Sequence, residues 1–216
     1  MKYYLSSYKF GNHADKLKLM LPQGAKVAHI NNARDSKMVS DKIRNKHLKE
    51  EMTFMDSLGF VSEHLDLKHY FGKKKQLRKK IHSFNGVWIC GGNAFVLRQA
   101  MKLSGFDNMF NELHFKKDFF YGGYSAGICV LSDSLKYIQF VDNSNDFPYK
   151  EIKETVWDGL KLFNYGILPH YKSNHPESEA IEKAVKRCID NKWPFKTLKD
   201  GEVLISDKGI IKIPEN

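Results

Sequence analysis

Short apolar runs alternate with stretches of helical spacing along this chain. The runs predict strands over Tyr3–Ser6, Lys26–Asn31, Phe60–Leu67, Gly86–Cys90, Phe119–Tyr124 and Gly166–Pro169. Apolar residues at helical spacing predict helices in a stretch ending near Pro22–Gly24 and over Asp41–Leu58, Gly72–His82, Phe95–Leu103 and Glu177–Asn191, with another beginning at Ile128–Leu131. A terminal hairpin is expected from Glu202–Ile205 and Gly209–Ile213, and a polar loop over Val141–Asp158.

Alternation of strands and helices indicates the fold class. Strands separated by helical crossovers pair in parallel and carry helices on both faces of the sheet. The 216 residues contain no internal repeat, linker or low-complexity tract. We therefore expect one α/β domain over residues 1–216, with three layers and a mostly parallel sheet.

Composition limits the class of protein and the cellular compartment that we expect for this chain. Apolar residues make up 42% and charged residues 28% of it, which is typical of a globular protein. The sequence has neither an apolar run of the ~20 residues that span a bilayer nor the apolar core of a secretory signal. Its three cysteines are widely spaced and form no CxxC pair, which excludes a disulfide scaffold. We expect a cytoplasmic protein with no membrane partner.

The net charge of +10 raises the question of a nucleic-acid partner. Much of the excess lies in Gly72–His82, where Leu77 and Ile81 are one helical turn apart and lysines surround them. This pattern is typical of the solvated face of an amphipathic helix. Because no aromatic residue interleaves with the lysines and no nucleic-acid motif is present, we expect no nucleic-acid partner.

The strongest chemical motif is the pentapeptide Gly123-Tyr-Ser-Ala-Gly127, which lies between a predicted strand and a predicted helix. A serine at such a sharp turn projects its hydroxyl from the sheet edge, and small neighbours let a substrate approach. The alternative is a glycine-rich turn with an incidental serine. The setting favours Ser125 as a nucleophile.

A nucleophilic serine needs a base, and His170 is the best candidate because it follows a predicted buried strand. His29, by contrast, lies inside a strand, where packing is its expected role. His175 lies close to His170 in sequence, but no acidic or thiol cluster joins the pair, so we expect no metal site.

The remaining catalytic groups are less closely defined by the sequence. Asp142 is the first candidate to orient His170, with Glu202 and three other carboxylates as rivals, namely Asp133, Asp146 and Asp158. Gly91-Gly92-Asn93 follows a strand and could direct one backbone N–H to an oxyanion, with the Ala126 N–H as the second donor. No phosphate-binding motif is present, so no cofactor is expected.

Three ordered motifs resemble those of the peptidase E family of serine peptidases, which includes aspartyl dipeptidase and, more distantly, cyanophycinase. They are the segments Ile89–Leu97 (ICGGNAFVL), Tyr121–Gly127 (YGGYSAG) and Ile167–Tyr171 (ILPHY), and the resemblance extends to the closing Lys199–Glu202 (KDGE). It covers nearly the whole chain.

This resemblance implies a class I glutamine amidotransferase-like fold with a flavodoxin-like core, in which serine replaces the nucleophilic cysteine. It implies that Ser125 is the nucleophile and His170 the base, with Gly92 and Ala126 at the oxyanion hole. The third member falls on or beside Asp142, or on Glu202 if the chain follows relatives that use a glutamate.

One departure concerns the substrate. The aspartyl dipeptidases hold an acidic side chain with an arginine beyond the histidine, and Glu179 occupies that position here. Asn93 and Glu179 are thus the candidate substrate-binding residues, and strict aspartyl-dipeptide specificity is not expected.

We expect a serine peptidase, dipeptidase-like, acting on short peptides. The alternatives are hydrolysis of another amide or ester, or a catalytically silent module that binds a small ligand. An uncovered sheet edge would favour a homodimer.

Overall fold

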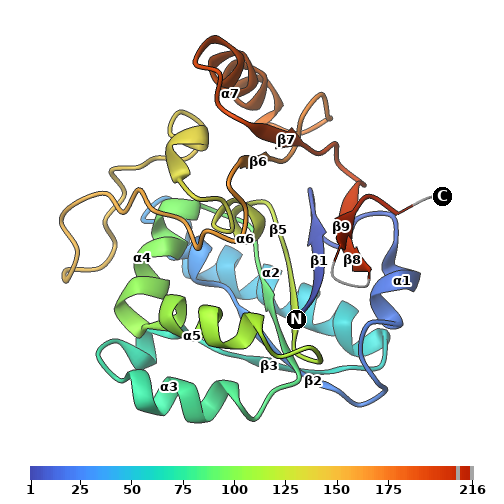
Figure 1. The fold of residues 1–216 in the computed structure, drawn as a ribbon. Helices are drawn as coiled ribbons and strands as arrows, with labels where there is room; N and C mark the ends of the chain where they lie inside the picture. The colour runs from blue at the N-terminus through green and yellow to red at the C-terminus, as the bar shows by residue number, and fades with distance from the viewer. Residues whose placement is uncertain (208–209, 215–216) are drawn as a thin grey trace.

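The strands of the molecule form a large and a small sheet (Figure 1). The large sheet contains β1 (Lys2–Ser6), β2 (Lys26–Ile30), β3 (Val61–His64), β4 (Gly86–Ile89), β5 (Phe120–Tyr124), β8 (Val203–Asp207) and β9 (Ile210–Lys212). Their order across the sheet is β3-β2-β4-β5-β1-β8-β9. The pairs from β3 to β1 are all parallel, whereas β8 is antiparallel to β1 and to β9. This computed structural model describes residues 1–207 and 210–214.

Helices cover both faces of this sheet, which confirms the mostly parallel, three-layer α/β fold. They are α1 (Ala14–Lys18), α2 (Asp41–Ser57), α3 (Lys74–Ile81), α4 (Ala94–Ser104), α5 (Phe106–His114), α6 (Ala126–Cys129) and α7 (Ser178–Asp190). Alternate residues of β1 face opposite layers, as the pleat requires. Tyr3 and Leu5 pack in the core with α3, α4 and α5, and Tyr4 packs in the core with α1 and α2.

The small sheet pairs β6 (Gly166–Leu168) in parallel with β7 (Phe195–Thr197). In Figure 1 it lies with α7 above the carboxyl ends of the main strands. The sequence places the strand before His170 in the main sheet, and that expectation is wrong. β6 belongs to the small sheet instead, and it places His170 next to the carboxyl edge of the main sheet.

Most predicted elements are confirmed. The helix predicted to begin at Ile128–Leu131 is instead α6, which begins at Ala126 and ends at Cys129. The segment predicted as one strand, Phe60–Leu67, ends as a strand at His64 and continues into a 3-10 helix, Leu67–Tyr70. Neither α5 nor β7 was predicted. Gly209, where the second strand of the terminal hairpin was predicted to begin, lies outside the described residues, although the pairing of β8 with β9 confirms the hairpin.

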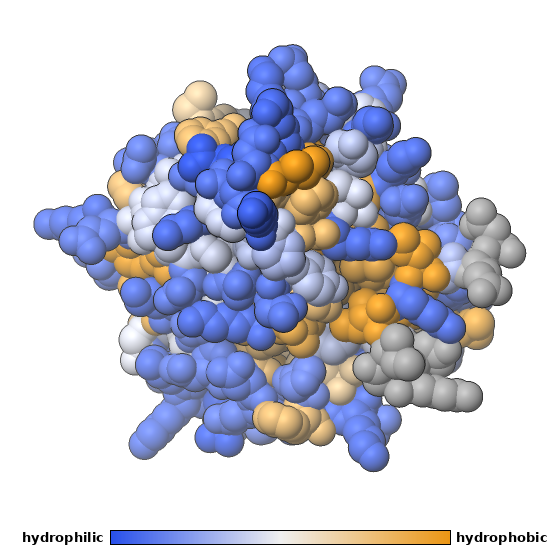
Figure 2. Space-filling model, turned by 45° about the horizontal axis from the view of Figure 1, so that its top comes forward, coloured by the Kyte–Doolittle hydropathy of each residue, from blue (hydrophilic) through white to orange (hydrophobic). Residues whose placement is uncertain are grey.

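The basic segment forms α3, and its apolar side is the buried one. Leu77 and Ile81 are fully buried, whereas Arg78 pairs with Glu112 at 2.8 Å on the surface. This confirms the amphipathic helix. The face shown in Figure 2 is mainly hydrophilic, with separate hydrophobic patches. Within the described ranges, every helix is too short or too polar to cross a membrane.

Candidate active site

The turn between β5 and α6 carries Ser125 in an uncommon backbone conformation, with φ 48° and ψ −114°. Such a conformation costs a non-glycine residue about 1–3 kcal/mol. A Cβ on Gly123 or Gly127 would lie 2.7 or 2.4 Å from the Ile89 carbonyl oxygen, so the two glycines let the turn pack against β4. The turn leaves Ser125 partly exposed at the carboxyl edge of the sheet.

His170 lies just after β6 and is almost fully buried, with 1% of its surface exposed. Its Nδ1 lies 2.7 Å from Oδ1 of Asp200, and because a carboxylate only accepts, Nδ1 carries the proton. The lone pair is therefore on Nε2. Burial lowers the pKa of His170 below 6.5, Asp200 opposes that shift, and the nearby His175 adds to it. His170 is therefore neutral at pH 7 and can accept a proton.

Asp200 is held in place by two further hydrogen bonds. Its Oδ1 accepts the Ser7 hydroxyl at 2.9 Å, and its backbone N–H donates to the Ser173 hydroxyl oxygen at 2.8 Å. A carboxylate fixed in this way holds the imidazole of His170 in one tautomer and one orientation.

The two carboxylates that the sequence favoured as partners of His170 bind backbone groups elsewhere. Asp142 accepts the Ala94 N–H at 2.8 Å, at the start of α4, where the free N–H groups of a helix attract a carboxylate. Glu202 accepts the Lys199 N–H at 2.7 Å and closes its own turn. The placement of Asp142 or Glu202 against the imidazole is corrected here, and the rivals Asp133, Asp146 and Asp158 are likewise not its hydrogen-bond partners among the described residues.

Asp142 has a perturbed carboxyl group nonetheless. Burial and the charge of Glu177 raise its pKa to about 7, and the hydrogen bond from the Ala94 N–H opposes that shift. The Asp142 carboxyl is therefore protonated more readily than an ordinary aspartate.

The end of β1 brings His170 beside the Ser125 turn. In the parallel pair β1–β5, Ser6 is opposite Tyr124, so the chain leaves the two strands at Ser7 and Ser125 side by side. The Ser7 hydroxyl oxygen accepts the His170 backbone N–H at 2.8 Å. One residue next to the nucleophile turn thus fixes the backbone of His170.

The Tyr8 ring spans the same region. It makes edge contacts with the rings of Tyr124, His170 and His175, at centroid distances of 6.2, 5.9 and 5.3 Å. Tyr8 therefore connects β5, which ends at Tyr124, with the loop that carries both histidines.

A buried network supports Tyr124, the residue before Ser125. Its hydroxyl donates to Glu51 at 2.5 Å and accepts from Arg34 at 3.2 Å. The same Glu51 carboxylate accepts from Trp88 at 3.3 Å and Cys90 at 3.0 Å. These bonds fix the carboxyl ends of β4 and β5 relative to each other.

The loop after β4 also lies against the Ser125 turn. A Cβ on Gly91 would lie 3.1 Å from the Cβ of Ser125. Gly92 has φ 145°, and a Cβ there would lie 2.6 Å from the Ala33 carbonyl oxygen, so only glycine fits. The structure therefore brings Gly92 and Ala126, the two residues expected at the oxyanion hole, to the same edge.

Asn93 was a candidate for substrate binding, but its side chain caps α4. The Oδ1 atom accepts from the N–H groups of Phe95 at 2.8 Å and Val96 at 3.1 Å, and Nδ2 donates to the Asn143 carbonyl oxygen at 2.9 Å. Capping of α4 is the observed role of this side chain, and because Nδ2 carries a second N–H, its contact with substrate stays a prediction.

Glu179, the other candidate for substrate binding, lies on the outer surface of α7. Its side chain is 82% exposed and pairs with Lys183 at 2.6 Å, one helical turn away. It therefore points to solvent and pairs within its own helix.

A third group joins the two histidines of this loop. The His170 and His175 rings stack at 3.6 Å between centroids with an interplanar angle of 6°. Oε2 of Glu177 lies 3.8 Å from His170 Nε2, and the ligand atoms of the three residues lie within 4.8 Å of one another. The sequence argument that no carboxylate accompanies the histidine pair is wrong on this point.

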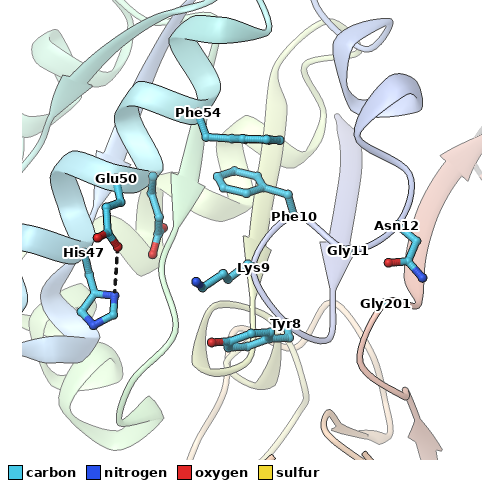
Figure 3. A pocket seen from close by; sticks show the side chains of 10 residues that line it. Tyr8, Lys9, Phe10, Gly11, Asn12, His47, Glu50, Phe54 and Gly201 are labelled. Carbon is cyan, nitrogen blue, oxygen red and sulfur yellow. Dashed lines mark ion pairs between the residues drawn. The ribbon is translucent and has the colours of Figure 1, made fainter. Parts of the chain in front are cut away.

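A cleft of about 670 Å³ borders these residues (Figure 3). It is lined by Tyr8, Lys9, Phe10, Gly11, Asn12, His47, Glu50, Glu51, Phe54 and Gly201. Tyr8 also contacts His170, and Gly201 follows Asp200, but neither Ser125 nor His170 lines the cleft. Figure 3 shows Lys9 between Tyr8 and the ion pair of His47 with Glu50, where Nδ1 and Oε2 are 3.8 Å apart.

Sequence reasoning missed four residues of this region: Asp200, Glu177, Tyr8 and Lys9. Asp200 was within reach, since it lies in the closing KDGE segment that carried part of the resemblance. Glu177 is two residues after His175, a spacing that could have marked a shared site. Tyr8 and Lys9 lie in a polar loop that contains no recognisable motif.

Comparison with known proteins gives a consistent family assignment. The model of peptidase family S51 matches residues 8–213. An uncharacterized peptidase from Listeria monocytogenes is 31% identical over 170 residues, which cover 75% of this chain and 79% of that protein. An uncharacterized peptidase from Pasteurella multocida is 24% identical over 175 residues, which cover 81% of this chain and 74% of that protein.

The fold has a counterpart among solved structures. A crystal structure from Listeria monocytogenes EGD-e, described as a candidate peptidase E, superimposes with a TM-score of 0.78. The match covers 100% of this chain and 98% of the other at 24% sequence identity. At that identity the likeness supports the fold.

Proposed function

Because the chain belongs to peptidase family S51, we propose that it is a serine peptidase that hydrolyses short peptides through an acyl-enzyme on Ser125. His170 is the general base and Asp200 orients it. The observation that carries the proposal is the hydrogen bond between His170 and Asp200, held by Ser7 beside the Ser125 turn. Gly92 and Ala126 supply the oxyanion donors.

The proposed reaction begins when the Ser125 hydroxyl attacks the scissile carbonyl. His170 Nε2 takes the hydroxyl proton, and Asp200 stabilises the imidazolium that forms. The imidazolium then protonates the leaving amine, and water hydrolyses the acyl-enzyme in a second round of the same proton transfers. The lowered pKa of His170 keeps the base unprotonated at neutral pH.

The tetrahedral intermediates carry a negative oxygen, which needs donors fixed in advance. The N–H of Ala126 is the first in α6, and Gly92 lies in the loop that packs on the Ser125 turn. Each such donor supplies about 3 kcal/mol of transition-state stabilisation in measured cases. In this proposal, the unusual backbone conformation of Ser125 serves to place its hydroxyl and the Ala126 N–H near the same substrate carbonyl.

The substrate class follows from the bordering cleft. Its volume of about 670 Å³ is in the range of small-molecule sites and holds a peptide of a few residues. Lys9 can meet a carboxylate, and Glu50 can meet an ammonium group. Side chains of both signs suit a short zwitterionic peptide, dipeptides among them.

A second candidate function is ligand binding without turnover, or hydrolysis of another amide or ester. One observation favours binding without turnover: among the described residues the Ser125 hydroxyl has no hydrogen-bond partner, and Nε2 of His170 faces Glu177 at 3.8 Å instead. Hydrogen bonds between catalytic groups are often long in the absence of substrate and shorten in the complex, so the serine peptidase remains the first choice.

Labelling with a fluorophosphonate probe tests the proposal, with mass spectrometry to locate the adduct and a dipeptide panel to measure hydrolysis. Wild type should label on Ser125, and Ser125→Ala should lose both the label and hydrolysis. Ser83→Ala, which removes an exposed serine that bonds only the Lys80 carbonyl oxygen, is the control and should label normally. Hydrolysis by Ser125→Ala at the wild-type rate would reject the mechanism, and ligand binding without any label would favour the second candidate.

A further inference from the structure

The loop between β6 and α7 gathers three metal-ligating side chains at one point. His170, His175 and Glu177 offer two imidazole nitrogens and a carboxylate oxygen, all within 4.8 Å of one another. A zinc ion binds such ligands at about 2.0–2.2 Å. Three donors spaced in this way can therefore surround one ion after small side-chain movements.

The surroundings of His170 match those of a metal ligand. Its Nδ1–H donates to Asp200 at 2.7 Å, so the lone pair is on Nε2, the nitrogen 3.8 Å from Glu177. Metal-ligating histidines usually donate their other ring N–H to a carboxylate or carbonyl, which fixes the tautomer and raises the basicity of the ligand. Asp200 meets that requirement whether or not a metal is bound.

The site is open to ions from solvent. The Glu177 side chain is 40% exposed, and His175 is half-buried. The two imidazole rings are parallel, so ligation requires the His175 ring to turn toward His170. This rotation would disturb the 3.2 Å hydrogen bond from the Glu177 N–H to His175 Nδ1 and the edge contact of the His175 ring with Tyr8.

We propose that His170 Nε2, His175 and Glu177 form a reversible inhibitory site for Zn²⁺, with water as the fourth ligand. Two imidazoles and one carboxylate suit zinc, whereas Mg²⁺ prefers oxygen ligands in octahedral geometry. The inhibitory part rests on the proposed function, because the ion takes the same Nε2 lone pair that accepts the Ser125 proton. The binding part does not depend on Ser125.

Metal binding is measured directly on the full chain after chelator treatment and buffer exchange. Co²⁺ reports tetrahedral nitrogen and oxygen ligation by its visible absorption, and competition with a chromophoric chelator gives the Zn²⁺ affinity. We expect one ion per chain in wild type and in Ser125→Ala. His175→Ala and Glu177→Gln should weaken binding roughly tenfold or more, and Asp200→Asn by about 10–100-fold through loss of the outer carboxylate.

A matched control exists in the cleft. His47 Nδ1 lies 3.8 Å from Glu50 Oε2, the same separation as between His170 and Glu177, but His47 belongs to no three-donor group in the described part of the chain. His47→Ala should keep the wild-type Co²⁺ spectrum and Zn²⁺ affinity. Equal Zn²⁺ affinity in wild type and His175→Ala would overturn the site.

Inhibition is measured by the rate of fluorophosphonate labelling. Zn²⁺ should slow labelling of wild type, EDTA should restore it, and Mg²⁺ should leave it unchanged. The Zn²⁺ concentration needed should rise roughly tenfold or more in His175→Ala, in step with its weaker binding. Zinc that binds at these residues without slowing the label would overturn the inhibitory role. A zinc site in Ser125→Ala, together with no label on wild type, would instead reject the serine mechanism and leave the metal site standing.

Discussion

The Ser7 hydroxyl oxygen accepts the backbone N–H of His170 at 2.8 Å and, through its own proton, donates to Asp200 Oδ1 at 2.9 Å. One side chain just after β1 thus fixes both His170 and the carboxylate that accepts its Nδ1–H. Ser7→Ala removes both bonds and leaves the His170 N–H without a partner. Because one hydrogen bond contributes about 1 kcal/mol, losing two should lower the rate of Ser125 labelling about 30-fold, measured by time-resolved mass spectrometry.

The control for this prediction is the preceding serine. Ser6 is also fully buried, but its hydroxyl donates to the Tyr8 carbonyl oxygen at 3.1 Å. Ser6→Ala should therefore change the labelling rate less than Ser7→Ala. Equal effects from the two substitutions would show that Ser7 acts through general packing and not through the His170–Asp200 pair.

Exchanging a carboxylate for an amide at three positions separates the candidates for the third catalytic member. Asp200→Asn preserves shape but offers His170 Nδ1 a weaker and ambiguous partner, and we expect turnover to fall about 10³- to 10⁴-fold. Asp142→Asn keeps an oxygen that can accept the Ala94 N–H, and Glu202→Gln keeps one for Lys199. Both should retain most activity.

The measurement is kcat/KM on the best dipeptide of the panel, with circular dichroism to check that each variant folds. A large loss in Asp142→Asn with Asp200→Asn near wild type would contradict the assignment of Asp200. Asp142→Asn should also be at least as stable as wild type at pH 8, because wild type must then bury the charge of a carboxyl whose pKa is raised to about 7.

Local patterns were enough to predict most of the fold. The apolar runs of β4 and β5 and the spacing of α2 and α4 are each visible in a short window of sequence. The glycines around Ser125 predicted the turn. The structure explains why they are needed, because the turn packs on β4 too closely to leave room for a Cβ. β7 was missed because only three residues, Phe195–Thr197, form it, and its pairing with β6 depends on contacts far along the chain.

The candidate site was predicted only in part, for a related reason. Ser125 and His170 have local signals, a turn motif and a strand end. The partner of His170 is the carboxylate that the fold places next to Nδ1. This carboxylate belongs to Asp200, which lies in the loop after β7, thirty residues after His170. Asp142 matched the expected sequence position, but the free N–H groups of α4 bind it instead. The order of residues in the sequence does not show whether a carboxylate will bind an imidazole or the free N–H groups at the start of a helix.

The pH dependence of labelling should reflect the environment of His170. Burial lowers its pKa below 6.5, so the neutral base is fully present above pH 6.5 and is lost as pH falls through the lowered pKa. We expect the acidic midpoint of the labelling rate to lie below pH 6.5. Because the charge of His175 contributes to the lowering, His175→Asn should move this midpoint upward. A midpoint above 6.5 in wild type would contradict a buried neutral base.

Gly92→Ala tests the loop that is proposed to supply one oxyanion donor. The added Cβ would lie 2.6 Å from the Ala33 carbonyl oxygen, so the loop must shift. Loss of one donor should lower kcat about 10²- to 10³-fold. Gly72→Ala is the control, since Gly72 also has positive φ, 70°, but nothing lies within 4 Å of its added Cβ. Similar losses of activity in both variants would mean that backbone strain and not the oxyanion loop is responsible.

His29 should make the free energy of unfolding depend on pH, because its pKa is lower in the folded chain than in the unfolded chain. It is fully buried on β2, neither ring nitrogen has a hydrogen-bond partner among the described residues, and burial lowers its pKa to about 3. Between pH 6.5 and 3 the unfolded chain binds a proton at His29 that the folded chain does not. The free energy of unfolding should therefore fall as pH falls, by up to about 1.4 kcal/mol per pH unit from this residue.

His29→Leu removes the effect, so its stability relative to wild type should increase steadily from pH 6.5 to pH 4 in urea titrations. His69→Leu, at an exposed histidine, should leave the slope unchanged. A constant difference between His29→Leu and wild type across this range would show that His29 is protonated or hydrated in the folded protein.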